Sequence, residues 1–229
     1  MLLSDSTPFK DLVISTRSGK ELHLLAPDAA QIEIEDIAHG LAYQCCFNGQ
    51  TRHFYSIAQH SMLVAQLVPA QHRLAALLHE GAAAYLGEIS RPLRHLMLEV
   101  QLIEKKIMAV FGEKFGVSEL DAPSIRRAHS IALATEYRDL FFHANKNDGQ
   151  SALPAPVPRR IEAITPEEAK YQFAEMLGKL VEGSGPHKHS PAATRPKAPG
   201  KPHGQPAMAQ GKSCQVFSFN PRRAERRMP

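Results

Sequence analysis

Residues 77–89 read LLHEGAAAYLGEI, and this stretch decides how the rest of the chain is interpreted. It sets His79 directly beside Glu80 inside an almost wholly apolar run. A further histidine, His60, lies in the preceding segment at 55–61. A histidine next to an acid, with another histidine one helix earlier, is how a helical protein can direct its ligands at one buried ion. The stretch therefore predicts a helical fold that carries a metal site.

The spacing of apolar residues predicts helices through most of the remaining body. Apolar residues recur every three or four positions, which is the period of one helix face. One corner differs, because two short apolar runs at 12–15 and 22–25 flank a glycine-containing turn and predict a hairpin. We expect an all-α helical bundle with a small N-terminal β-hairpin. The predicted helices span 34–45, 56–67, 72–86, 93–115, 124–142 and 166–181, and a loop spans 145–160.

Charge and composition divide the chain after residue 182. Nine of the 27 basic residues but one of the 23 acidic residues lie in 183–229, which leaves a tail of +8 and a body of −4. Eight of the 17 prolines lie in the same tail, which has no periodic apolar pattern. Such a segment cannot bury enough apolar surface to offset the entropy of ordering. We therefore expect a helical domain at 1–182 and a disordered C-terminal tail at 183–229.

The sequence also restricts the compartment. No apolar run approaches the roughly 18 residues that a membrane helix requires, and the N-terminus lacks the charged and apolar regions of a signal peptide. Cys45 and Cys46 are adjacent and Cys214 lies in the tail, so no paired disulfide framework is indicated. These features predict a cytoplasmic protein with reduced thiols and no membrane contact.

Several motifs in a fixed order make the body resemble the HD-domain metal-dependent phosphohydrolases. The nearest branch contains 5′-deoxynucleotidase-like and phage deoxynucleotide triphosphohydrolase-like proteins. The resemblance runs over 12–142 and leaves the tail uncovered. The matching segments are FNG at 47–49, TR at 51–52, FYSIAQHS at 54–61, LLHE at 77–80, AYLG at 84–87, RPL at 91–93 and ALATEYRDL at 132–140.

The resemblance implies four metal ligands: His60, the adjacent pair His79 and Glu80, and His129. The family's pair is His-Asp and its last ligand is Asp, so Glu80 lengthens one carboxylate and His129 exchanges the other for an imidazole. Three imidazoles and one carboxylate favour one divalent transition metal ion, such as Zn²⁺, Fe²⁺, Ni²⁺, Co²⁺ or Mn²⁺, over Mg²⁺. The simpler alternative is that these histidines are partly buried and hydrogen-bonded without an ion.

The resemblance also implies that several of the family's catalytic residues around the metal are missing. A glutamate that assists proton transfer aligns with Ala83, a basic residue that serves the phosphate aligns with Cys46, and a histidine aligns with Gln50. Removal of a general acid or base typically costs about 10²–10⁴-fold in rate. Glu88, which aligns with an Asp, is the best remaining acid for proton transfer.

Other residues are candidates for binding a nucleotide or for supporting the bundle. We expect phosphate contacts from arginines and a stacking wall from tyrosines, although an exposed arginine can also be merely solvated. An acid-rich motif near the end of the body reads as an internal ion network with a structural role. The phosphate candidates are Arg52, Arg91 and Arg94; the wall candidates are Tyr55 and Tyr85; the network consists of Glu136, Arg138 and Asp139.

Two functions follow from these observations. One is a divergent metal-dependent phosphohydrolase that acts on a nucleotide or a related phosphoester. The other is a catalytically inactive HD-fold pseudoenzyme that binds a nucleotide, a protein or nucleic acid. The basic tail predicts weak, salt-sensitive contact with phosphate backbones, and its alternative is a solubilising extension without a partner. Relatives of this family often self-associate, which leaves a homo-oligomer open.

Overall fold

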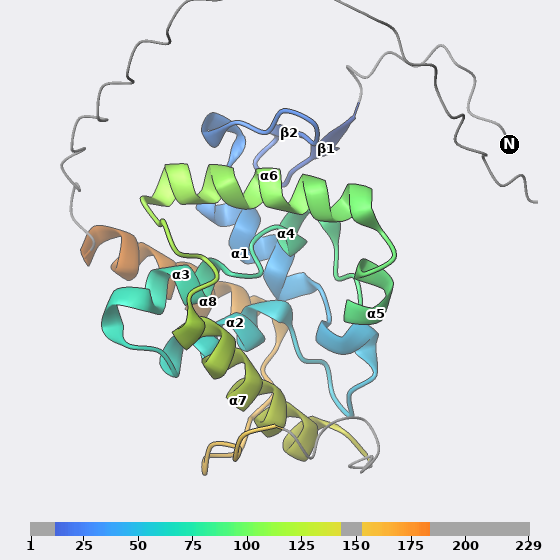
Figure 1. The fold of residues 1–229 in the computed structure, drawn as a ribbon, viewed down its shortest axis with the longest axis vertical. Coiled ribbons are helices and arrows are strands. Elements are labelled where there is room, and N and C mark those ends of the chain that lie inside the picture. Colours follow the sequence, from blue (N-terminus) through green and yellow to red (C-terminus); the bar gives the residue numbers. More distant parts are fainter. Residues whose placement is uncertain (1–11, 143–152, 184–229) are drawn as a thin grey trace, which may run out of the picture. The chain divides into compact units, whose positions relative to one another are not determined.

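A computed structural model describes residues 12–142 and 153–183 and confirms an all-α fold with a small hairpin near the N-terminus (Figure 1). The tail predicted at 183–229 lies outside the described residues except for Gly183, as does the first half of the predicted loop at 145–160. Among the described helices, none combines the length and apolar character that crossing a bilayer requires.

The hairpin is joined to the first helix by its turn. Strands β1 (Val13–Ser15) and β2 (Glu21–His23) pair antiparallel, with the completely buried Leu22 opposite Ile14. The backbone N–H and the hydroxyl of Ser18 both donate to the Asp36 carboxylate at 2.7 Å. Because Asp36 lies in the first turn of a helix, this contact fixes the hairpin against the body.

Helices account for most of the remaining regular structure, and the long ones other than α6 agree with the predicted spans to within two residues. Three shorter helices lie between them in the sequence. The long helices are α1 (Ile34–Tyr43), α2 (Ile57–Gln66), α6 (Leu98–Phe115), α7 (Pro123–Leu140) and α8 (Pro166–Gly183). The short helices are α3 (Arg73–Leu78), α4 (Ala83–Leu86) and α5 (Arg91–Arg94).

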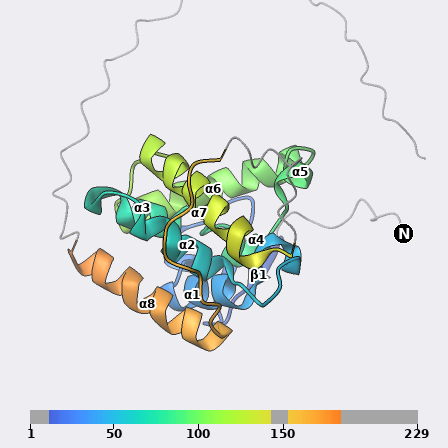
Figure 2. The same cartoon turned by 90° about the horizontal axis from the view of Figure 1, so that it is seen from below.

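Helices α1 and α2 carry most of the helix packing. Helix α1 contacts α2, α4 and α8, and α2 contacts α3, α7 and α8. Figure 2 shows α8 running beside α1. The core between these helices includes Ile37, Leu41, Leu77, Phe111 and Phe173, each with no exposed surface. This arrangement places α2, α3 and α7 around one shared interior.

The prediction of one helix over 72–86 is wrong, because the chain breaks between α3 and α4. At the break, the Gly81 N–H donates to the Leu78 carbonyl and the Ala83 N–H donates to the Glu80 carbonyl, which tightens the turn. Gly81 also lets the Phe111 ring approach, since a Cβ there would lie 2.1 Å from a ring carbon. The break therefore sets His79 and Glu80 on a turn.

A second predicted helix, over 93–115, is also divided. The structure has a short α5 and then a separate α6 that begins at Leu98. The Gln101 side chain donates to the Arg94 carbonyl at 2.7 Å and so links the two helices across the break. This bend brings Arg94 within reach of α6, where its Nε lies 3.2 Å from a Glu104 carboxylate oxygen.

The predicted ion network is confirmed for Arg138 and Asp139, and it also includes residues of the segment before α8. Arg138 donates through Nε and one Nη to both oxygens of Asp139, at 2.7 Å each. The Asp139 carboxylate also accepts from Arg160 and from the Ile161 backbone N–H at 2.9 Å. These bonds attach the segment before α8 to α7. The Arg138 guanidinium, with smaller effects from its other partners, holds the pKa of Asp139 well below its usual range.

Replacement of Asp139 by asparagine is expected to destabilise the protein at pH 7 by about 2 kcal/mol, because charge-assisted hydrogen bonds are lost. The Asp139 pKa is lower in the folded than in the unfolded state, so its contribution is complete above about pH 4 and declines as the pH falls further. Urea unfolding at pH 7 and at pH 3 measures this. A wild-type advantage that is equally large at both values would contradict the assignment.

Candidate metal centre

Three separate segments bring the four predicted ligands to one place. His60 lies in α2, His79 and Glu80 follow α3, and His129 lies in α7. One ligand atom from each residue lies within 4.8 Å of those of all the others. The ring centroids of the histidines are 5.0 Å to 5.7 Å apart. This group, called the His/Glu cluster below, could hold a metal ion.

Two of the imidazoles are oriented by hydrogen bonds at Nδ1. In His60, Nδ1 lies 2.7 Å from a Glu136 carboxylate oxygen, and in His79 it lies 2.6 Å from the Ala76 carbonyl. Because a carbonyl or carboxylate oxygen accepts, each Nδ1 carries a proton, which leaves Nε2 of each ring as the atom available to a metal ion once it is unprotonated. Metal-binding histidines commonly have this outer partner.

The Nε2 atom of His79 tests independently whether the cluster suits a metal ion. It is buried and has no hydrogen-bond partner in the described part of the chain. An unpaired buried acceptor is costly, and a bound cation would satisfy it. The neighbouring Glu80 carboxylate lies 3.8 Å away and is one quarter exposed. The donor set and its orientation therefore fit a divalent ion.

Burial and mutual repulsion determine the charges of the three imidazoles. Burial, followed by the charge of His60, lowers the pKa of His79 to about 3 and that of His129 to about 4. Burial acts in the same direction on His60, but the Glu136 carboxylate more than offsets it and raises the pKa of His60. At neutral pH, His79 and His129 are therefore uncharged, which is the form that binds a metal ion.

Glu136 lies beside the His/Glu cluster, where the sequence did not place it. Its assignment to the ion network with Arg138 and Asp139 is wrong, because its carboxylate faces His60 and accepts the Tyr55 hydroxyl at 2.9 Å. The local sequence around Glu136 does not indicate that its side chain contacts His60. The partner of Glu136 is 76 positions away in the sequence, and only the packing of α2 against α7 brings the two together.

The tyrosines predicted as walls for a base are both in the core. Tyr55 is 1% exposed and is held by its bond to Glu136. Tyr85 is 8% exposed, and its ring packs edge-on against Phe111 at a centroid distance of 6.3 Å. Aromatic residues at these positions serve packing, so neither ring presents an open stacking surface.

Among the three candidate arginines, Arg94 forms an ion pair with the His/Glu cluster. One guanidinium nitrogen lies 3.8 Å from Glu80, while its Nε lies near Glu104. Arg52 stacks over the Phe142 ring at 5.2 Å, and Arg91 lies exposed at the start of α5. Arg94 is thus the candidate phosphate contact that the structure places beside the cluster, between two carboxylates.

Glu88 secures an unusual backbone turn. The turn at Cys46–Gly49 holds two non-glycine residues with positive φ, Phe47 at 57° and Asn48 at 51°. Their N–H groups donate to the two Glu88 carboxylate oxygens at 2.8 Å and 3.1 Å. A left-handed conformation of a non-glycine residue costs energy and persists where surrounding contacts hold it. Glu88 therefore stabilises this turn, and its predicted role in proton transfer stays a prediction.

The residues at the positions where the HD resemblance implies missing catalytic groups have structural roles. Cys46 is 8% exposed, and burial, with smaller effects of nearby carboxylates, raises the pKa of its thiol. It is therefore an uncharged core residue. Ala83 is 7% exposed, and its carbonyl accepts from the Gln44 side chain at 2.9 Å. Gln50 closes the turn by donating its N–H to the Phe47 carbonyl.

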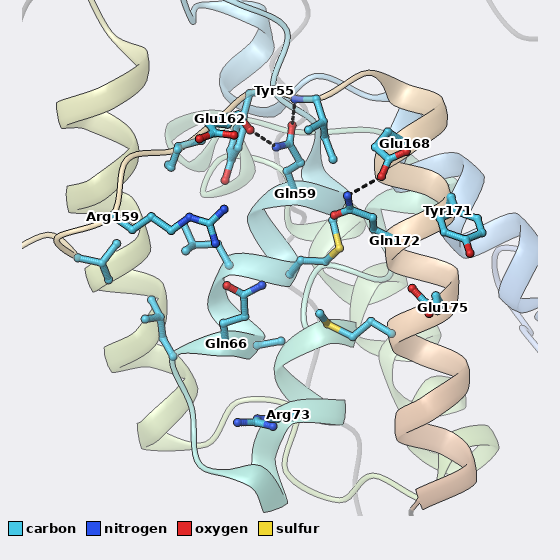
Figure 3. A pocket seen from close by; sticks show the side chains of 18 of the residues that line it. Tyr55, Gln59, Gln66, Arg73, Arg159, Glu162, Glu168, Tyr171, Gln172 and Glu175 are labelled. Carbon is cyan, nitrogen blue, oxygen red and sulfur yellow. Dashed lines mark hydrogen bonds between the residues drawn. The ribbon is translucent and has the colours of Figure 1, made fainter.

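A separate groove lies between α2 and α8 (Figure 3). Its volume is about 1070 Å³, and none of the four cluster residues lines it. Figure 3 shows the Gln59 side chain bridging to the segment before α8, where it donates to the Glu162 carbonyl at 3.0 Å and accepts from the Ile164 N–H. The groove therefore reflects how this segment and α8 are joined to α2.

Comparison with known proteins identifies relatives but no activity. No family model matches the chain. It is 36% identical over 174 residues to the uncharacterized protein YfdR of Escherichia coli, a match that covers 74% of this chain and 96% of that protein. It is 37% identical over 125 residues to an uncharacterized protein of Rhodobacter capsulatus, over 50% of this chain and 64% of that protein. The residues of the site are therefore the evidence for its function.

Replacement of Glu88 by glutamine is expected to loosen the turn, because an amide provides one neutral acceptor where the carboxylate provides two charged ones. We expect a loss of about 1–3 kcal/mol in unfolding free energy and faster amide exchange at Phe47 and Asn48. Glu99→Gln on the exposed start of α6 is the matched control. Unchanged exchange at both amides would show that Glu88 does not hold the turn.

Proposed function

The chain belongs to the family of the Escherichia coli protein YfdR, and we propose that it is a divergent HD-type, metal-dependent phosphohydrolase. Its substrate would be a nucleotide or a related phosphoester. One observation carries this proposal: four potential ligands from three separate segments converge within 4.8 Å. The buried, unpartnered Nε2 of His79 adds independent support for a cation at this place.

His60, His79, Glu80 and His129 would hold the ion, and the donor set favours a divalent transition metal. Such an ion supplies Lewis acidity, which lowers the pKa of water and draws charge from a phosphoryl group. Imidazole nitrogen suits Zn²⁺, Fe²⁺, Co²⁺ and Ni²⁺ better than Mg²⁺, and Mn²⁺ accepts the mixed set as well. Because all four ligands come from the protein, an ion that prefers six ligands would keep two further positions for substrate and water.

The surrounding side chains divide the remaining tasks. Arg94 supports phosphate binding because its guanidinium is the charged donor beside Glu80. Glu88 is the acid that we propose for proton transfer, because it is the carboxylate that the HD resemblance leaves at this position, and its oxygens accept from the Phe47 and Asn48 N–H groups. His60, held by Glu136, keeps its ring fixed towards the cluster. We also propose that the protein acts in the cytoplasm.

A second candidate is a metal-binding module without catalysis. One set of observations favours it: the Glu88 carboxylate is already used by two backbone N–H groups, and Cys46 is a buried neutral thiol where the family's phosphate-binding cation would stand. Ala83 offers no proton to transfer. In this case the bundle would bind a nucleotide or a partner, and the basic tail would add a salt-sensitive contact to nucleic acid.

A comparison of wild type with Glu80→Asp/Ala83→Glu/His129→Asp separates the candidates. Elemental analysis should give about one transition metal ion per wild-type chain, because one cluster provides a full ligand set. A nucleotide panel should then show release of phosphate, pyrophosphate or triphosphate. The altered protein should be faster by about 10²–10⁴-fold, because a general acid or base is restored.

Three outcomes decide between these functions. Metal-bound wild type that turns over supports the hydrolase. Metal-bound wild type that is inert, beside an active triple variant, supports the non-catalytic module. Wild type that binds none of the divalent ions and hydrolyses nothing contradicts both.

A further inference from the structure

The Glu136 carboxylate is completely buried beside the His/Glu cluster. Its side chain has no exposed surface, and one oxygen accepts from both His60 Nδ1 at 2.7 Å and the Tyr55 hydroxyl at 2.9 Å. The second oxygen is buried without a hydrogen-bond partner in the described part of the chain. No lysine or arginine of this part is paired with it by an ion pair. The imidazole of His60 is therefore its main source of compensating charge.

A carboxylate in this position is expensive if its role is only structural. Burial of an ionised group costs several kcal/mol unless it is paired and hydrogen-bonded, and an apolar residue of similar volume is often at least as stabilising. Here one oxygen is left unsatisfied, which adds to the cost. The burial of the Glu136 carboxylate is better explained if a cation binds on the far side of the His60 imidazole and balances its charge.

We propose that Glu136 is the positioning residue of the metal centre, which fixes the His60 ring so that Nε2 faces the cluster and adds negative charge behind it. This inference rests on the metal site of the proposed function but not on hydrolysis. Glu80 is the one carboxylate among the four ligands. Glu136 brings the negative charge around a divalent ion to two, through a carboxylate–imidazole pair.

The other imidazoles show why Glu136 is the residue to test. His79 is oriented by the neutral Ala76 carbonyl, which no side-chain substitution removes. His129 has no hydrogen-bonded partner at its ring nitrogens among the described residues. The pair of His60 and Glu136 is thus the charged anchor of the cluster.

Glu136→Gln tests the proposal with little change of shape. Glutamine can still accept from His60 and Tyr55, but it removes the negative charge. The matched control is Thr135→Val, one position earlier in α7, since Thr135 is equally buried but its hydroxyl contacts the Ile131 carbonyl and the Val157 N–H instead of the cluster. Zn²⁺ and Co²⁺ affinities are measured by competition with a chromophoric chelator, and thermal stability is measured without metal.

We expect Glu136→Gln to bind both ions about 10–100-fold more weakly than wild type, as is typical when the outer partner of a metal-bound histidine is changed. The visible absorption spectrum of bound Co²⁺ should also shift. Thr135→Val should lower stability and leave the affinity and spectrum unchanged. Glu136→Gln with wild-type affinity and spectrum would overturn the proposal, and so would wild type that binds neither ion. Affinity loss in a protein that hydrolyses nothing would support the positioning role and contradict the hydrolase alone.

A measurement on wild type covers the case in which Glu136→Gln does not fold. Long-range ¹H–¹⁵N NMR of the histidine rings reports which nitrogen carries the proton. We expect the His60 Nδ1 proton to persist after Zn²⁺ is added while the Nε2 resonance shifts. Loss of the Nδ1 proton, or an unshifted Nε2, would overturn the proposal.

Discussion

Three imidazole rings share one interior space, and this crowding is the constraint on which the rest of the site depends. Their centroids lie 5.0 Å to 5.7 Å apart, in a region closed by α2, α3 and α7. Burial and the nearby charge of His60 disfavour protonation of His79 and His129, so both remain neutral with available lone pairs. A cation bound by these lone pairs would give a partner to His79 Nε2, which has none in the described part of the chain.

The surroundings of the cluster are dominated by acids. Glu136 lies behind His60, Glu88 secures the turn at Cys46–Gly49, and Glu104 shares Arg94 with Glu80. This charge pattern suits retention of a divalent ion. It is less suited to a highly charged phosphate, because Arg94 is already flanked by two carboxylates. These residues therefore favour metal binding more than phosphate binding. Both proposed functions start from the same metal centre and differ in whether it acts on a phosphate.

The fold class was predictable because it depends on short-range patterns, whereas the four cluster residues were indicated by the resemblance to HD-domain proteins. The periodicity of α1, α2, α6, α7 and α8 is visible in each segment separately. The break between α3 and α4 was not predicted, and at this break Gly81 packs closely against Phe111 of a distant helix. The partner of Glu136 and the burial of Tyr55 and Tyr85 were likewise set by contacts between distant segments. Residue type states what a side chain can do, whereas tertiary packing determines which neighbour it meets.

X-ray absorption spectroscopy of the Zn²⁺-loaded protein tests most directly whether the His/Glu cluster is a metal centre. The imidazole rings produce outer-shell scattering that a carboxylate or water does not, so the number of bound histidines can be counted. We expect three imidazoles and one oxygen donor from Glu80, with no sulfur, since Cys46 is not part of the cluster. A first shell that contains sulfur, or one with fewer than two imidazoles, would show that the His/Glu cluster is not the metal centre.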